Sequence, residues 1–139
     1  MAGKIKVYSD GGSRGNPGPA ACAFVVYKDN DILFKNAVFL GRTTNNIAEY
    51  NGVLSALNWL SKNKDKIGEG EIEFFLDSEL VVKQLTGAYR VKNSLLKNLF
   101  VLVKEKEKEI GKDVLYRHVY REKNKLADLL LNNKLDFKD

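Results

Sequence analysis

Cysteine and histidine are almost missing from this sequence, which has one of each in 139 residues. A single cysteine, Cys22, excludes an intramolecular disulfide, and one cysteine with one histidine excludes a zinc site of the usual kind. Cys22 lies in the apolar run 20–26, so we interpret it as a buried core thiol in a protein of a reducing, cytoplasmic compartment. No apolar run approaches the roughly 20 residues that a membrane span needs, and no signal peptide precedes the first expected strand.

The charge imbalance is also small, with 23 Lys and Arg against 18 Asp and Glu, a net charge of +5. This excess favours a polyanionic partner but equally fits an ordinary protein surface. The length suits one domain, residues 1–139, and 44% hydrophobic residues are enough for a packed core and exclude general disorder. We find no internal repeat or domain boundary, and we expect a monomer.

Hydrophobic periodicity and turn residues predict an α/β fold. The predicted strands are 5–8 (ending on Asp10), 20–28, 32–40, 71–76 and 114–120, and the predicted helices are 47–62, 78–86, 93–110 and 125–134. A glycine loop is expected directly after Asp10, and a charged linker at 62–70. The first three strands are close enough in sequence for an antiparallel meander, whereas the later strands follow helices and are expected to run parallel to the first.

Two carboxylates terminate predicted strands, and two more lie in apolar helical stretches. Asp10 and Asp77 end the first and fourth strands, and the carboxyl ends of neighbouring parallel strands lie at one edge of a sheet. Glu49 falls inside the apolar arc of helix 47–62, and Asp128 lies among leucines near the C-terminus. Buried carboxylates are rare unless paired. We therefore expect all four to converge at one edge of the sheet.

Taken singly, these residues have simpler interpretations. Asp77 before Ser78 could be no more than a helix cap, and Asp10 before two glycines could be no more than a turn residue. Together, four like charges must hold protons at raised pKa or bind a cation. Carboxylate oxygens favour Mg²⁺ or Mn²⁺, and two such ions can promote phosphodiester hydrolysis. The glycine loop is not a P-loop, because it lacks the Gly-Lys-Ser/Thr ending and leads to a strand.

Four segments of the chain, in order, resemble the motifs of type 1 ribonuclease H. They are residues 8–20 (YSDGGSRGNPGPA), 44–50 (TNNIAEY), 77–82 (DSELVV) and 121–128 (REKNKLAD). Each motif alone would be weak evidence, but the four together cover nearly the whole chain. The loop before Asp128 is short, as in archaeal relatives, and the histidine loop and basic protrusion of other members are absent. We interpret His118, which falls within the last predicted strand, as structural or solvent-facing.

The resemblance implies the fold, the reaction and the site. The implied fold is a five-stranded mixed sheet flanked by helices. The implied reaction is Mg²⁺-dependent endonucleolytic cleavage of the RNA strand of an RNA–DNA hybrid, largely independent of sequence, leaving 5′-phosphate and 3′-hydroxyl ends. Asp10, Glu49, Asp77 and Asp128 are implied as catalytic carboxylates and ligands of two Mg²⁺ ions, with Mn²⁺ as a substitute. Substrate contacts are implied for Gly11, Gly12, Arg14, Asn16, Thr44, Asn45 and Asn46. The minor groove displays the 2′-hydroxyl that distinguishes RNA from DNA, and Asn side chains both donate and accept there.

Two alternatives stay open from the sequence. A non-catalytic module could keep the sheet and only bind duplexes, although such a module would be expected to lose one or more of the carboxylates. An enzyme with the same chemistry could also cut double-stranded RNA or RNA at a junction with DNA.

Overall fold

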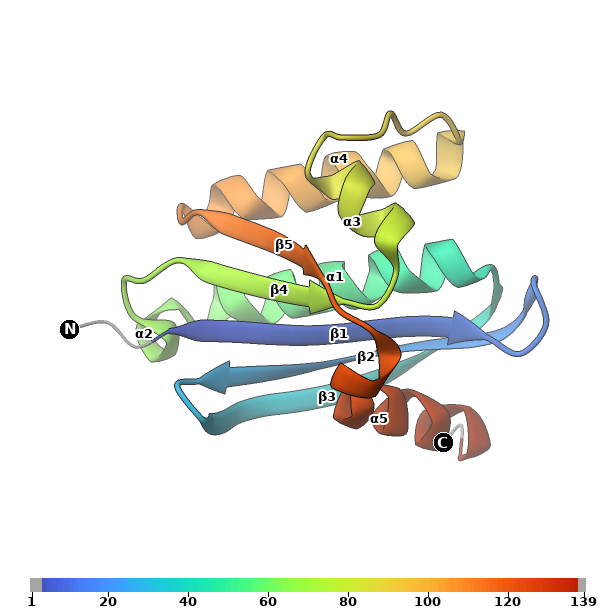
Figure 1. Ribbon diagram of the computed structural model, residues 1–139, viewed down its shortest axis with the longest axis horizontal. Helices are drawn as coiled ribbons and strands as arrows, with labels where there is room; N and C mark the ends of the chain where they lie inside the picture. Colours follow the sequence, from blue (N-terminus) through green and yellow to red (C-terminus); the bar gives the residue numbers. More distant parts are fainter. Residues whose placement is uncertain (1–3, 138–139) are drawn as a thin grey trace.

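The computed structural model of the chain describes residues 4–137. Its strands are β1 (Ile5–Ser13), β2 (Gly18–Lys28), β3 (Asp31–Thr43), β4 (Ile72–Leu76) and β5 (Val114–His118). Its helices are α1 (Asn45–Lys62), α2 (Lys64–Ile67), α3 (Glu79–Leu85), α4 (Ser94–Ile110), the 3₁₀ turn η1 (Arg121–Lys123) and α5 (Lys125–Asp136). Figure 1 shows how these elements are arranged. Among the described residues, no helix is both long enough and apolar enough to cross a membrane.

The five strands form one mixed sheet in the order β3-β2-β1-β4-β5. β1, β2 and β3 pair antiparallel as consecutive neighbours. β4 pairs parallel to β1, and β5 pairs parallel to β4. The sequence-based prediction of an antiparallel meander followed by two parallel strands is therefore confirmed.

The prediction that β1 ends on Asp10 and gives way to a glycine loop is wrong. β1 continues to Ser13, and its pairing with β2 runs through Asp10, Gly11 and Gly12. The loop proper occupies only residues 14–17. Glycine is disfavoured in strands unless another backbone approaches closely, and that condition holds at Gly11, as described below.

The helix boundaries follow capping residues. Thr44, rather than Asn45 or Asn46, is the N-cap of α1, and its hydroxyl accepts a hydrogen bond from the Ile47 N–H. Ser78 and Asn93 cap α3 and α4 in the same way. The predicted charged linker at 62–70 contains the short helix α2, which the sequence pattern does not predict.

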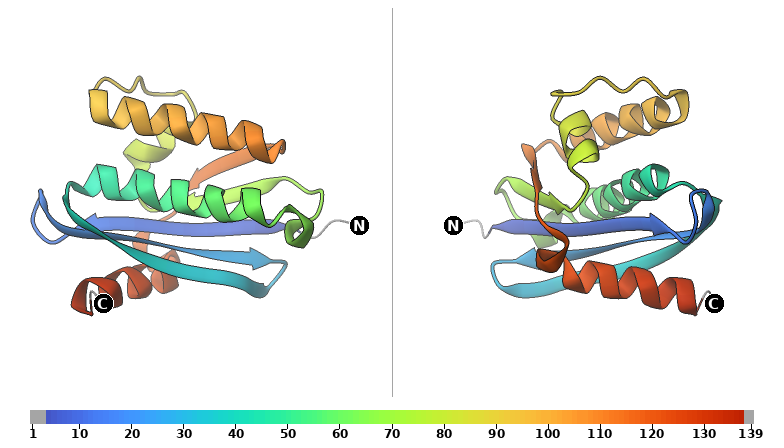
Figure 2. Two further views of the ribbon diagram at one scale, coloured as in Figure 1. Left: turned by 180° about the vertical axis from the view of Figure 1, so that it is seen from behind. Right: turned by 45° about the vertical axis from the view of Figure 1, so that its right-hand side comes forward.

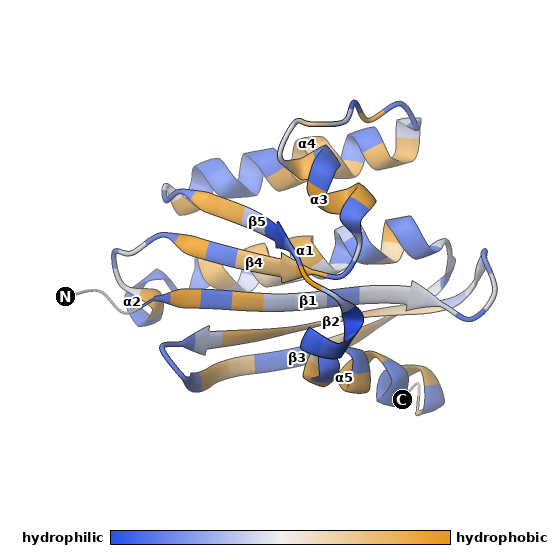
Figure 3. Cartoon of the chain, viewed as in Figure 1, coloured by the Kyte–Doolittle hydropathy of each residue, from blue (hydrophilic) through white to orange (hydrophobic). Residues whose placement is uncertain are grey.

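Helices cover the two faces of the sheet unequally. α1 packs on one face against β1 and β2, with α4 stacked on α1, whereas α5 packs on the other face against β1, β2 and β3. β2 is buried along almost its whole length because it lies between α1 and α5. β4 alternates between buried and half-buried residues, and β5 buries only its middle residue, because only one face of each strand meets the core. Their other face is therefore open. Most residues of β4 are nevertheless hydrophobic (Figure 3).

Candidate active site

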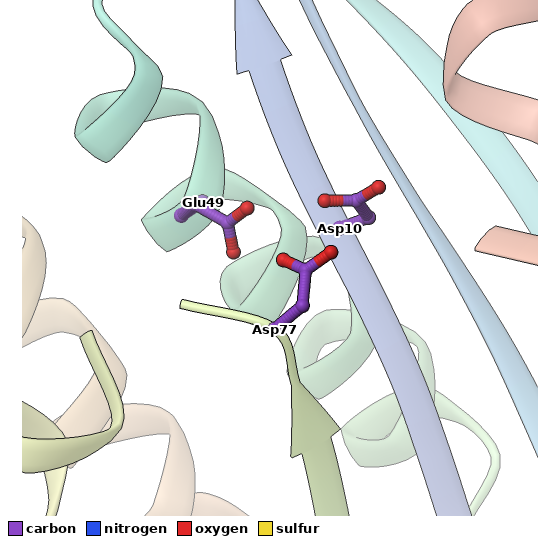
Figure 4. Close-up of side chains that lie close together, drawn as sticks. All are labelled: Asp10, Glu49 and Asp77. Atoms are coloured by element: carbon purple, nitrogen blue, oxygen red, sulfur yellow. The ribbon is translucent and has the colours of Figure 1, made fainter. Parts of the chain in front are cut away.

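Three carboxylates from distant parts of the chain meet beside the carboxyl end of β4. Asp10 comes from the middle of β1, Glu49 from the second turn of α1, and Asp77 directly follows β4. Figure 4 shows the three side chains pointing toward one another. One carboxylate oxygen of each lies within 4.8 Å of the others. The parallel pairing of β4 with β1 accounts for the meeting of Asp10 and Asp77, as the sequence predicts.

Two glycines allow α1 to approach β1 closely enough to bring Glu49 into this group. A Cβ atom on Gly11 would lie 2.2 Å from the carbonyl carbon of Ala48, on the backbone of α1. From the other side, a Cβ on Gly52 would lie 3.0 Å from the Asp10 carbonyl oxygen. Any side chain at Gly11 would push the helix away. Gly11 of β1 and Gly52 of α1 therefore serve the packing of the carboxylate cluster.

The carboxylates are buried and mutually repulsive. Asp10 is 3% exposed and Glu49 is 5% exposed. Burial, followed by the charge of Asp77, raises the pKa of Asp10 from its ordinary value of 3.8 to about 7. Burial, followed by the charge of Asp10, raises the pKa of Glu49 well above its usual range. Burial also raises the pKa of Asp77.

The donor set of this cluster suits a hard divalent cation. The Gly11 N–H donates to Asp10 Oδ1 at 2.9 Å and to Glu49 Oε1 at 3.1 Å, which fixes one oxygen of each carboxylate. Glu49 Oε2 and Asp77 Oδ2 are buried and have no hydrogen-bond partner among the described residues. Oxygens of this kind keep lone pairs available for a cation. A divalent ion there would compensate for the burial of the carboxylates and for their mutual repulsion, which together raise their pKa values.

Asp128, the fourth predicted carboxylate, lies near this group but outside its tightest part. It is on the first turn of α5 and lines the same cavity as the other three. Its negative charge is close enough to contribute to the raised pKa values of Asp10 and Asp77. The Asn132 side-chain amide donates to both the Asp128 carbonyl and its carboxylate, at 2.9 and 3.2 Å. The structure thus brings together the four residues predicted from the sequence, with Asp128 at the rim.

Most of the predicted substrate-binding residues border the same cavity, which has a volume of about 390 Å³. Gly11, Gly12, Arg14, Asn45 and Asn46 line it. Asn16 and Thr44 do not line it, and both are engaged with the backbone of the α1 N-terminus: Asn16 Oδ1 accepts from the Asn45 N–H, and Thr44 is the cap described above.

Internal hydrogen bonds hold the rim of the cavity. Asn45 Oδ1 accepts from both the N–H and the hydroxyl of Ser13, at 2.9 and 3.1 Å, which ties α1 to the end of β1. The Arg14 guanidinium forms an ion pair with Asp136 at 2.6 Å and reaches Asn132, both on α5. Arg14 thereby links the loop after β1 to the C-terminal helix.

Two further residues beside the carboxylates were not predicted as site residues. Arg121, on η1, lines the cavity, and its Nε lies 3.9 Å from Asp77 Oδ2. The guanidinium partly offsets the burial that raises the pKa of Asp77. His118, at the end of β5, is also close enough to act on Asp77 in the same direction. The sequence signal for Arg121 was its place at the start of the fourth motif, seven residues before Asp128.

Comparison with known proteins gives consistent matches. A family model described as "Reverse transcriptase-like" matches residues 8–134. A curated protein named ribonuclease HI from Halobacterium salinarum is 39% identical over 135 residues, which are 96% of this chain and 65% of that protein. The bifunctional protein Rv2228c of Mycobacterium tuberculosis is 36% identical over 135 residues, 96% of this chain and 36% of that protein. The chain therefore spans less than two thirds of the length of these two curated relatives.

A solved structure of a similar protein contains nucleic acid. LC11-RNase H1, isolated from compost and solved in complex with an RNA/DNA hybrid, is 39% identical and superposes with a TM-score of 0.90. The match covers 96% of this chain and 97% of that chain. Similarity in both sequence and fold thus extends over the segments that carry all four carboxylates.

Proposed function

The chain belongs to the type 1 ribonuclease H family, and on that basis we propose that it is an endoribonuclease that hydrolyses the RNA strand of RNA–DNA hybrids. The observation that carries this proposal is the meeting of Asp10, Glu49 and Asp77 at one point, with Asp128 at the rim of the same cavity. The solved complex of the similar LC11 protein with an RNA/DNA hybrid supports the choice of substrate. The products would carry 5′-phosphate and 3′-hydroxyl ends.

The four carboxylates would hold two Mg²⁺ ions, for which Mn²⁺ could substitute. Glu49 Oε2 and Asp77 Oδ2, which lack hydrogen-bond partners among the described residues, are oxygens through which the cluster would bind them. When bound, such ions supply Lewis-acid activation of water and neutralise charge at the scissile phosphate. The Gly11 N–H orients the Asp10 and Glu49 carboxylates, and burial of both excludes competing water.

Substrate recognition would fall to the rim of the cavity. Asn45 and Asn46 at the start of α1, with the backbone of Gly12, would face the minor groove and its 2′-hydroxyls. Arg14 would approach a phosphate, and Thr44 and Asn16 would hold the α1 N-terminus in place. None of these contacts reads a base edge in the major groove, so cleavage would be largely independent of sequence.

The 139 residues would act as one catalytic domain, because the family model and the sheet both extend over nearly all of them. We place the protein in the cytoplasm, where a buried, unpaired thiol such as Cys22 stays reduced.

Cleavage of an end-labelled hybrid tests the proposal. With Mg²⁺ the RNA strand should be cut at several positions and the DNA strand left intact, and EDTA should abolish cutting. Asp10→Asn and Asp77→Asn should lose activity with an unchanged circular dichroism spectrum, because they remove charge with little change in volume. RNA duplex and DNA duplex, measured in the same salt series, define the substrate range. Binding of the hybrid without cleavage, or turnover by either variant at the normal rate, would refute the assignment.

A further inference from the structure

The open face of the sheet carries a second cleft, separate from the carboxylate cavity. In Figure 1 no helix lies in front of the first halves of β1 and β4, because α5 covers only the opposite end of β1. A cleft of about 310 Å³ lies here, between this face and the start of α5. Its lining includes Lys6 and Tyr8 of β1, Tyr27 of β2, and Lys123 and Lys125 beside and on α5. Its volume approaches that of small-molecule sites in proteins.

Aromatic side chains form one wall of this cleft. Tyr8 stacks on Phe75 of β4, directly across the parallel pair, with ring centroids 4.8 Å apart. Tyr27 meets Tyr8 edge to face at 5.7 Å. None of the three rings is fully buried, and neither tyrosine hydroxyl has a hydrogen-bond partner among the described residues. Aromatic residues with polar tips and partial exposure suit a planar, polar ligand.

The other wall is positively charged. Lys123 and Lys125 are exposed and have no ion-pair partner among the described residues. A third positive charge belongs to the aromatic wall, where the Lys6 Nζ lies over the Phe75 ring, 5.9 Å from its centroid. Asp29 is the one acidic residue that lines the cleft within the described part of the chain, so three lysines face one carboxylate. This balance favours an anionic ligand.

The cleft and the carboxylates share one face of β1. Side chains two residues apart in a strand point to the same side, about 6.6 Å apart along it, so Lys6, Tyr8 and Asp10 form one row. The segment leading into α5 crosses β1 between them, where the Asn124 side-chain amide donates to the Ser9 carbonyl at 2.9 Å. A single strand held in the cleft would therefore lie beside, and not inside, the carboxylate cavity.

We propose that this cleft binds single-stranded nucleic acid: Tyr8 and Tyr27 contact an unpaired base, and Lys6, Lys123 and Lys125 contact its flanking phosphates. Interleaved aromatic and basic side chains are the usual means of holding a single strand without sequence preference. The ligand is distinct from the hybrid proposed above, and its binding does not require the hydrolytic reaction.

Fluorescence anisotropy with a labelled oligo(dT) tests the proposal. The measurement is made in EDTA, because without a bound cation the carboxylate cluster repels phosphate and does not bind the oligonucleotide itself. Tyr8→Leu should weaken binding about 5- to 150-fold, because contact with an aromatic ring is lost. An oligonucleotide of abasic sites should bind the unaltered protein more weakly than oligo(dT) does, by a similar factor. Its affinity for Tyr8→Leu should equal its affinity for the unaltered protein. The abasic comparison needs no variant, so it remains decisive if Tyr8→Leu folds poorly.

The phosphate contacts are tested by the salt dependence of binding. The double variant Lys123→Gln/Lys125→Gln should reduce the slope of log affinity against log salt by about 1.4, the value expected for two phosphate contacts on a single strand. The matched control Lys62→Gln/Lys108→Gln removes the same charge from exposed positions on α1 and α4 and should leave the slope unchanged.

Four results would overturn the proposal. In the first, the abasic strand binds as tightly as oligo(dT). In the second, the two double variants reduce the salt slope equally. In the third and fourth, poly-glutamate of the same charge, or free thymidine monophosphate, binds as tightly as oligo(dT). The first three would mean that only general electrostatic attraction acts, and the last that the cleft takes a mononucleotide instead of a strand. If one of these results were found and the same protein still cleaved a blunt hybrid normally, only this inference would have failed and the proposed function would stand.

Discussion

The buried carboxylate cluster should destabilise the metal-free protein in a pH-dependent way, and Asp10→Asn should relieve it. The pKa of Asp10 is raised from 3.8 to about 7 in the folded state. Between these pH values the folded protein holds a proton that the unfolded chain has lost, so stability falls as pH rises. One pKa unit corresponds to about 1.4 kcal/mol, so the loss at and above pH 7 amounts to ~4 kcal/mol.

Asp10→Asn removes this loss while its amide oxygen can still accept the Gly11 N–H. The difference in free energy of unfolding between variant and unaltered protein should grow from near zero below pH 4 to ~4 kcal/mol in favour of the variant above pH 7. Urea unfolding in EDTA, followed by circular dichroism from pH 3.5 to 8.5, measures it. Asp113→Asn, at an exposed position just before β5, is the matched control and should give a flat difference within ~0.5 kcal/mol.

A flat difference for Asp10→Asn, or one that shrinks as pH rises, would refute the electrostatic reasoning. Saturating Mg²⁺ should raise the stability of the unaltered protein at pH 8 and leave that of the variant nearly unchanged, because ligands that bind only the folded state stabilise it.

Three further substitutions test the packing and the rim. Gly11→Ala should cost at least ~3 kcal/mol of unfolding free energy, because its Cβ would collide with the backbone of α1. Gly12→Ala should cost less than ~1 kcal/mol, because its Cβ would meet Leu131 at an ordinary 3.6 Å. Similar urea midpoints for the two variants would contradict the close approach of α1 to Gly11. Asn124→Ala should cost ~1–3 kcal/mol, because the buried Ser9 carbonyl loses its donor; thermal unfolding would disprove this if the melting temperature were unchanged. Arg14→Ala should change stability by less than ~1 kcal/mol, as its ion pair is exposed, but raise KM for the hybrid several-fold with little change in kcat; an unchanged KM would remove Arg14 from the phosphate contacts.

The sequence predicts the sheet and the carboxylates because both depend on local pattern. Helices between later strands require parallel pairing, which brings Asp77 beside Asp10. The position of Glu49 inside an apolar helical arc correctly indicates its burial. These inferences use only side-chain periodicity and connection length, which are visible in a single chain.

Other features arise from contacts between distant segments and leave little local signal. Gly11 and Gly12 have the composition of a loop, yet both pair with β2, and α1 packs directly on the backbone of Gly11. The rim position of Asp128 depends on how α5 lies on the sheet. Arg121 is close to Asp77 only because the segment between β5 and α5 passes the end of β4 (Figure 1). The fourth motif includes Arg121, but nothing in the sequence of the charged tripeptide 121–123 indicates that it lies beside Asp77.

Titration of the metal-free protein with Mn²⁺ by isothermal calorimetry tests most directly whether acidic side chains from separate segments act as one cation site. Saturable binding to the unaltered protein is expected, with a large loss of affinity in each of Asp10→Asn, Glu49→Gln and Asp77→Asn. Unchanged Mn²⁺ affinity in any one of these variants would contradict the account, because a site held jointly by these side chains weakens when one of its ligands is removed.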